Sequence, residues 1–143
     1  MLFRSLKFTT PAALSAAVNS TEFDSLANGS ESNLLPNVDN TSTLLEFAEV
    51  TILLGSITPG ASPTITLNVY VTDGTNTPDK GSNCDTYVGK VATGTGAKVV
   101  TFPQVKLYPF NIKFSLTNNT GVALAASGNS LKHRVYTEQT TST

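Results

Sequence analysis

The run Thr64 to Thr72 (TITLNVYVT) alternates apolar and polar residues at every position. In an extended chain, one face carries the apolar members: Ile65, Leu67, Val69 and Val71. The opposite face carries Thr64, Thr66, Asn68, Tyr70 and Thr72. A period of two built from β-branched residues is typical of a half-buried antiparallel strand. The run therefore requires a sheet with one face turned toward a core.

Further strand-like runs, separated by turn signals, fill the chain from about residue 44. They cover residues 44–54, 86–92, 98–102, 110–117, 122–126 and 131–136. In the fourth of these, Phe110, Ile112, Phe114 and Leu116 are predicted to face inward. Seven or eight short strands without helical periodicity predict an all-β fold, a single jelly-roll-like antiparallel β-sandwich whose strand order stays open.

The first 43 residues have a different composition and predict an irregular N-terminal arm. This arm, residues 1–43, includes a possible strand near Leu2 to Phe8 and a possible short helix over Pro11 to Val18. The sandwich domain is expected to occupy residues 44–143. The polar stretch from Thr137 onward is expected to fray.

Low charge excludes several function classes. Charged residues make up 13% of the 143-residue chain, and the net charge is −1, which is no electrostatic footprint for nucleic acid. Thr, Ser and Asn account for 48 residues, so neutral side chains supply most of the polarity. No apolar run is long enough to span a membrane. A single cysteine and a single histidine allow neither an internal disulfide nor a multi-histidine metal site. We expect no cofactor and no enzymatic activity.

Several polar groups remain as candidate sites. Asp73, Asp79 and Asp85 lie in one oxygen-rich loop and form a weak calcium candidate, although their spacing matches no EF-hand. The alternative is a solvated loop whose Asp residues set turns. His133 shares a strand face with apolar neighbours, which favours a core role over a catalytic one. Cys84 has no second cysteine and is expected to be an unreactive thiol.

Glu46 and Glu49 are three residues apart on one strand and therefore point to opposite faces. This arrangement does not suit the paired carboxylates of a glycosidase, which must share one cleft. A buried member of the pair would need a cationic partner such as Lys113 or Arg134.

The second part of the chain resembles a type of small virion protein of tailed bacteriophages, the β-sandwich capsid decoration (cement) type. The residues that carry this resemblance are Leu44 to Leu54, Leu67 to Asn76 (LNVYVTDGTN) and Pro109 to Tyr136 (PFNIKFSLTNNTGVALAASGNSLKHRVY). The resemblance implies a virion location on the capsid surface, after assembly in the host cytoplasm. It implies binding to the major capsid protein and self-association as a homotrimer or homodimer, without nucleic acid or membrane partners.

Interface residues are expected at Leu2, Phe3, Phe8 and Tyr70. Two other functions stay open. A tail-fibre or spike module for carbohydrate or receptor binding would use exposed aromatics such as Tyr70. A tail-tube or head–tail connector component would instead form a ring.

Overall fold

The computed structural model describes residues 4–8 and 20–142. One short 3-10 helix, η1 (Ser20–Phe23), precedes most of the strands. The strands are β1 (Arg4–Phe8), β2 (Val38–Asp39), β3 (Phe47–Ile57), β4 (Thr64–Thr72), β5 (Asp85–Lys90), β6 (Gly96–Lys106), β7 (Asn111–Asn119), β8 (Ser130–Tyr136) and β9 (Glu138–Ser142). No helix among these residues is long and apolar enough to cross a bilayer.

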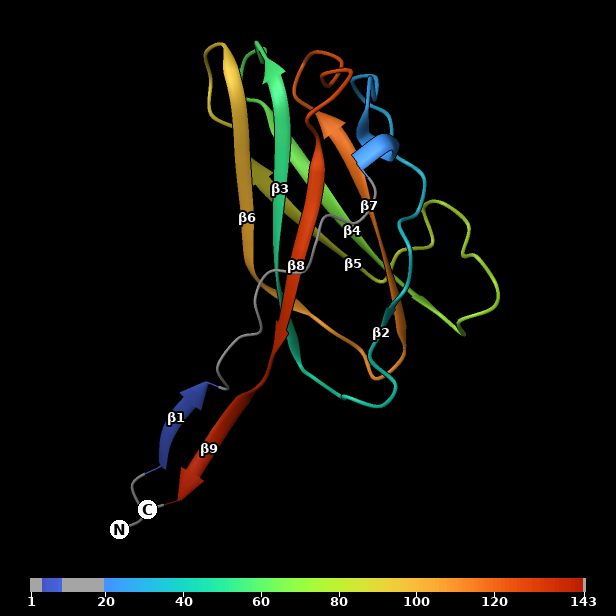
Figure 1. The fold of residues 1–143 in the computed structure, drawn as a ribbon, viewed down its shortest axis with the longest axis vertical. Helices are drawn as coiled ribbons and strands as arrows, with labels where there is room; N and C mark the ends of the chain where they lie inside the picture. The colour runs from blue at the N-terminus through green and yellow to red at the C-terminus, as the bar shows by residue number, and fades with distance from the viewer. Residues whose placement is uncertain (1–3, 9–19, 143) are drawn as a thin grey trace.

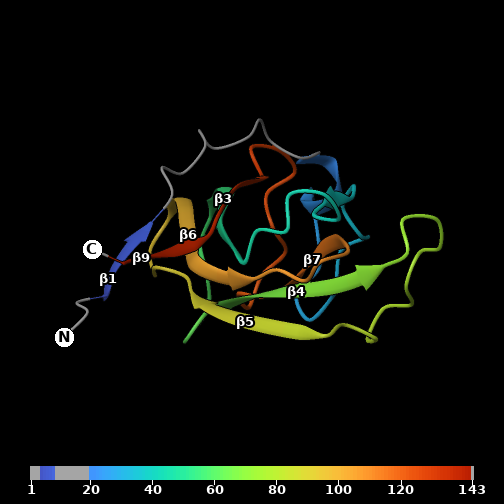
Figure 2. The same ribbon diagram turned by 90° about the horizontal axis from the view of Figure 1, so that it is seen from below.

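Two antiparallel sheets pack face to face, which confirms the predicted β-sandwich. One sheet has the order β2-β7-β4-β5 and the other has the order β6-β3-β8. Figure 2 shows the two layers from below. Because β9 follows β8 after one residue, the two can be counted as one final strand, and β1 pairs with its β9 part. The orders are then 1-8-3-6 and 2-7-4-5, which is jelly-roll topology.

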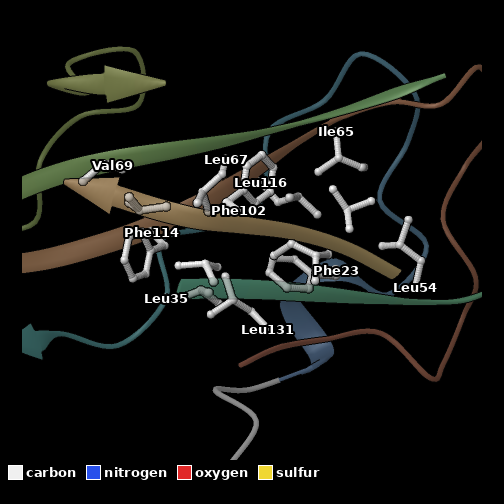
Figure 3. Close-up of a cluster of buried hydrophobic side chains, with 14 of the residues drawn as sticks. Phe23, Leu35, Leu54, Ile65, Leu67, Val69, Phe102, Phe114, Leu116 and Leu131 are labelled. Atoms are coloured by element: carbon white, nitrogen blue, oxygen red, sulfur yellow. The ribbon is translucent and has the colours of Figure 1, made fainter. Parts of the chain in front are cut away.

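The core lies between the sheets and consists of side chains that alternate along the strands. Ile65, Leu67 and Val69 of β4 are fully buried, as the sequence pattern predicts. They meet Phe114 and Leu116 of β7 and residues of the opposite sheet (Figure 3).

Residues 20–43 belong to the sandwich, so the domain begins before residue 44. Phe23 and Leu35 are buried in the core and are labelled in Figure 3. The segment runs beside β7, where the amides of Ser32 and Leu35 donate to the carbonyls of Leu116 and Phe114. Residues 20–43 therefore form an edge segment that backbone hydrogen bonds hold against β7, although their composition shows no strand pattern.

Other sequence predictions need correction. Residues 122–126 form a loop rather than a strand, with Leu124 buried and its amide bonded to the Leu26 carbonyl. Phe110 lies just before β7 and is 50% exposed instead of facing inward. The polar stretch 138–142 forms β9, because β1 supplies it with a pairing partner. The predicted helix over residues 11–18 lies outside the described residues.

Candidate functional site

A polar cluster on the outer face of the four-stranded sheet is built around Glu31. A β-bridge pairs Glu31 with Thr117 of β7, which places the glutamate beside the outward row of that strand. Its Oε1 accepts hydrogen bonds from the hydroxyls of Tyr70 (2.5 Å) and Ser115. The carboxylate thus crosses the edge of the sheet and joins β7 to β4.

Tyr70 is fully buried, so the expectation that it is available for an interface or a sugar is wrong. Its ring does project outward from β4, but the Glu31 segment and the loop after β4 cover it. The Gly81 amide donates to the Tyr70 hydroxyl at 3.2 Å. Burial, followed by the hydrogen bond to Glu31, raises the pKa of Tyr70, so the phenol stays protonated and remains a donor.

The remaining members of the cluster satisfy one another. The Asn68 amide donates to the hydroxyls of Ser115 (3.1 Å) and Thr117 (3.0 Å). Lys80 Nζ donates to the Glu31 carbonyl at 3.1 Å, which ties the loop 73–84 to the same place. Every buried side-chain nitrogen or oxygen in the described part of the chain has a hydrogen-bond partner. Such a network holds a loop rigidly, and it presents no activated nucleophile.

The three carboxylates of the calcium candidate do not converge. Asp73 Oδ1 accepts from the amides of Thr75 (2.8 Å) and Asn76 (2.7 Å), and these hydrogen bonds lower its pKa. The Asp79 carbonyl closes a turn with Ser82. Within the described ranges, no group of three or more His, Cys, Asp or Glu side chains is placed to hold a metal ion. The alternative prediction of loop-forming aspartates describes this loop better.

Asp85 has a different role, because it anchors an aromatic corner near the β5 edge. The Tyr108 hydroxyl donates to Asp85 Oδ2 at 2.8 Å, and this bond is the main reason that the pKa of Tyr108 rises to about 12. Lys106 Nζ lies 5.1 Å from the centre of the Tyr108 ring. The Tyr87 hydroxyl accepts from the Lys106 amide at 2.9 Å, so it links β5 to β6.

The remaining sequence candidates have other partners. His133 packs 6.4 Å from the Phe114 ring, and burial lowers its pKa. Burial and the nearby Asp85 charge raise the pKa of Cys84, which disfavours the nucleophilic thiolate. Glu49 pairs with Arg134 at 2.5 Å, one of the two partners that the sequence suggests.

Leu2 and Phe3 lie outside the described residues. Phe8 lies in β1, where its backbone is paired with Glu138.

One side of the sandwich exposes both edge strands. In the described structure, β5 pairs only with β4, and β6 pairs only with β3. Val88 of β5 is 67% exposed and Val99 of β6 is 64% exposed. Unpaired strands with apolar side chains are surfaces on which another chain can pair. Below, "the open edge" means β5 and β6 together.

Comparison with protein-family models, with curated proteins and with solved structures finds no match to this chain.

Sequence reasoning missed Glu31, although it recognised the strand that this residue faces. Glu31 stands within NGSESN, a run of turn-forming residues with no strand periodicity. The available signal was on β4, where Tyr70 stands in the outward row and is much larger than its Thr and Asn neighbours. An outward tyrosine of that size would otherwise leave a large ring in solvent, and its position favours a covering segment.

Proposed function

We propose that the chain is a structural protein of a virus particle, a capsid decoration protein that binds the outer surface of the shell and stabilises it. The observation that carries this proposal is the open edge. Monomeric β-proteins usually cover such strands or place charges on them. Here β6 extends over 11 residues, with Val99 outward and exposed.

The chemistry of this edge suits contact with another protein. Its exposed cations, Lys90 and Lys106, stand at the ends of β5 and β6. Around Val88 and Val99 the strands carry mostly neutral residues, so these stretches suit strand addition, a recognition mode in which main-chain hydrogen bonds supply the affinity. A shell offers the same site many times, so individually weak contacts suffice when each copy is held at more than one point.

The polar clusters support a binding role over a catalytic one. The polar groups of the Glu31 network form hydrogen bonds with one another. The hydrogen bond to Asp85 keeps the Tyr108 hydroxyl protonated. The carbohydrate-binding alternative loses its main aromatic, because Tyr70 is covered. The fold supports the proposal only by analogy, since jelly rolls serve many functions.

Particle binding tests the proposal directly. Particles of the virus that encodes the chain would be purified by density gradient, and an antibody to the chain would detect it in intact heads and separated tails. We expect it on heads, with loss when the shell is destabilised. Detection on tails alone would favour the tail-tube or connector alternative, and absence from particles would refute a virion role.

A pair of variants tests whether the open edge makes the contact. Val99→Lys places a charge on β6 and should weaken binding of the purified chain to particles stripped of it. Leu44→Lys changes a residue of similar exposure (59%) in the loop before β3, whereas Val99 pairs with Leu53 toward the other end of that strand, and this control should leave binding unchanged. Equal binding by both variants would exclude the β6 edge.

A further inference from the structure

The first and last described strands form a small sheet of their own. β1 and β9 pair antiparallel, with Arg4 opposite Ser142 and Phe8 opposite Glu138. Figure 1 shows this pair extending away from the sandwich, below the end of β8. We call it the β1–β9 ribbon.

The ribbon departs from the usual jelly-roll arrangement. In that topology the first strand lies along the last strand within the sheet. Here β1 pairs with β9, beyond the point where β8 leaves β3. Among the described residues, β3 is the only strand that pairs with β8, so the other edge of β8 has no strand beside it. The first strand is thus displaced along the last one, off the body of the molecule.

A ribbon in this position is poorly supported by its own chain. Each of its strands has five residues, and in the described part of the chain each pairs only with the other. An isolated two-stranded sheet is marginally stable in water, because it buries too little surface to offset the ordering of its backbone. A ribbon that stands off the body therefore gains most from a second surface.

The length of the connection in sequence sets how far β1 can reach. Residues 9–19 separate β1 from η1 along the chain. Eleven residues can span at most about 35 Å when extended. That reach exceeds the spacing of neighbouring strands, about 4.8 Å, several-fold. The connection is therefore long enough for β1 to reach the β9 strand of an adjoining copy.

We infer that β1 is exchanged between copies of this chain, so that β1 of one copy pairs with β9 of another in the same register. The exchange preserves every β1–β9 backbone pair and replaces only its source, which makes it a low-cost route to an oligomer. Charge favours this pairing over β1 with β1. β1 contains Arg4 and Lys7, whereas β9 contains Glu138 and no cation. The inference goes beyond capsid binding and does not depend on it.

Disulfide trapping distinguishes exchange from pairing within one chain. In a Cys84→Ser background, one chain carries Leu6→Cys and a second, differently tagged chain carries Thr140→Cys, because these positions are opposite each other. The two chains are co-expressed, oxidised and separated without reductant. We expect a covalent species that contains both tags. Replacing Leu6→Cys with Val88→Cys, at an exposed site on β5, should abolish it.

A double variant and a mass measurement complete the test. With both cysteines in one chain, exchange gives covalent multimers, whereas pairing within the chain gives a cross-linked monomer. Deleting residues 1–8 should reduce the mass measured by light scattering to that of a monomer, with strand content retained by circular dichroism. A cross-linked monomer together with no linkage between the single variants would overturn the inference. No virus particles are used, so this result is separate from that of the capsid experiment.

Discussion

Gly55 offers the sharpest test of how the loop after β7 packs on the sandwich. This glycine lies near the end of β3, under the turn that contains Ser127. Its amide donates to Asn129 Oδ1 at 3.0 Å, and the Asn129 amide in turn donates to Asp24 Oδ1 (2.8 Å) and to the Ala125 carbonyl (2.7 Å). A single side chain thus joins β3, the loop and the N-terminal segment.

A Gly55→Ala substitution leaves no room for its methyl group. The new Cβ would lie 2.2 Å from the Ser127 carbonyl oxygen and 2.7 Å from the Ala125 Cβ. Non-bonded carbon contacts are favourable at about 3.5 Å, so the loop backbone must move by roughly 1 Å. Such overpacking costs about 1–3 kcal/mol, and loss of the Asn129 bond adds about 1 kcal/mol.

We therefore expect Gly55→Ala to lower the free energy of unfolding by about 2–4 kcal/mol. For a domain of this size, each kcal/mol corresponds to about 2–4 °C in Tm, so the midpoint should fall by roughly 5–15 °C. Urea unfolding followed by circular dichroism and by tyrosine fluorescence measures the first quantity, and a thermal scan measures the second.

Gly60→Ala is the matched control. A Cβ at Gly60 meets nothing closer than the Gly121 Cα at 3.4 Å, which is an ordinary contact. Its effect should stay within about 0.5 kcal/mol. If Gly55→Ala and Gly60→Ala unfold at the same urea concentration, the loop does not press on β3 as described, and the packing argument fails.

Three further outcomes follow from the polar groups. Glu31→Gln removes the charged acceptor of the Tyr70 hydroxyl and should lower the urea midpoint by an amount equivalent to about 1–3 kcal/mol; an unchanged midpoint would count against the network. Because the folded-state pKa of His133 lies below 6.5, the unfolded chain binds more protons on acidification, so stability should fall as pH drops from 7 toward 5, and less so in His133→Gln. Equal pH dependence of the two proteins would contradict this. Absorbance at alkaline pH should show Tyr108 ionising at about pH 12, and Asp85→Asn should lower that value toward 10; the same titration curve in both would exclude the Asp85 bond as the cause.

The strand pattern could be predicted from the sequence because alternation reports directly on burial. The expected span 64–72 coincides with β4, and three residues of its apolar row, Ile65, Leu67 and Val69, are fully buried. The edges were harder to predict, because β2 has two residues and the segment before it carries no period. Pairing there depends on backbone amides, such as that of Ser32. Because almost every residue has a backbone amide, such pairing leaves no signal in the sequence. The alternation within a strand shows which side chains face inward and which face outward. It does not show which distant segment covers the outward face.

Local sequence patterns also could not predict the contacts at the candidate site. Tyr70 was assigned to the correct face of β4 and to the wrong environment, because Glu31 is 39 residues away in sequence. The grouping of Asp73, Asp79 and Asp85 failed for the opposite reason. Closeness in sequence suggested a common site, but each residue has a different partner. Asp73 accepts from the Thr75 amide, the Asp79 carbonyl accepts from Ser82, and Asp85 accepts from Tyr108.

The strand order has a consequence for how the chain reaches its fold. β2 and β4 belong to one sheet, but neither pairs with the other, because β7 lies between them and joins both. The second edge of β3 is covered only by β8, about 80 residues later. Contacts between segments so distant in sequence place folding in the range of milliseconds to seconds, slower than for helical domains of similar size. During synthesis, β3 and β4 emerge with unpaired edges and apolar faces well before their partners exist. Growing chains at high expression levels should therefore aggregate unless a chaperone shields these two strands until β7 and β8 arrive.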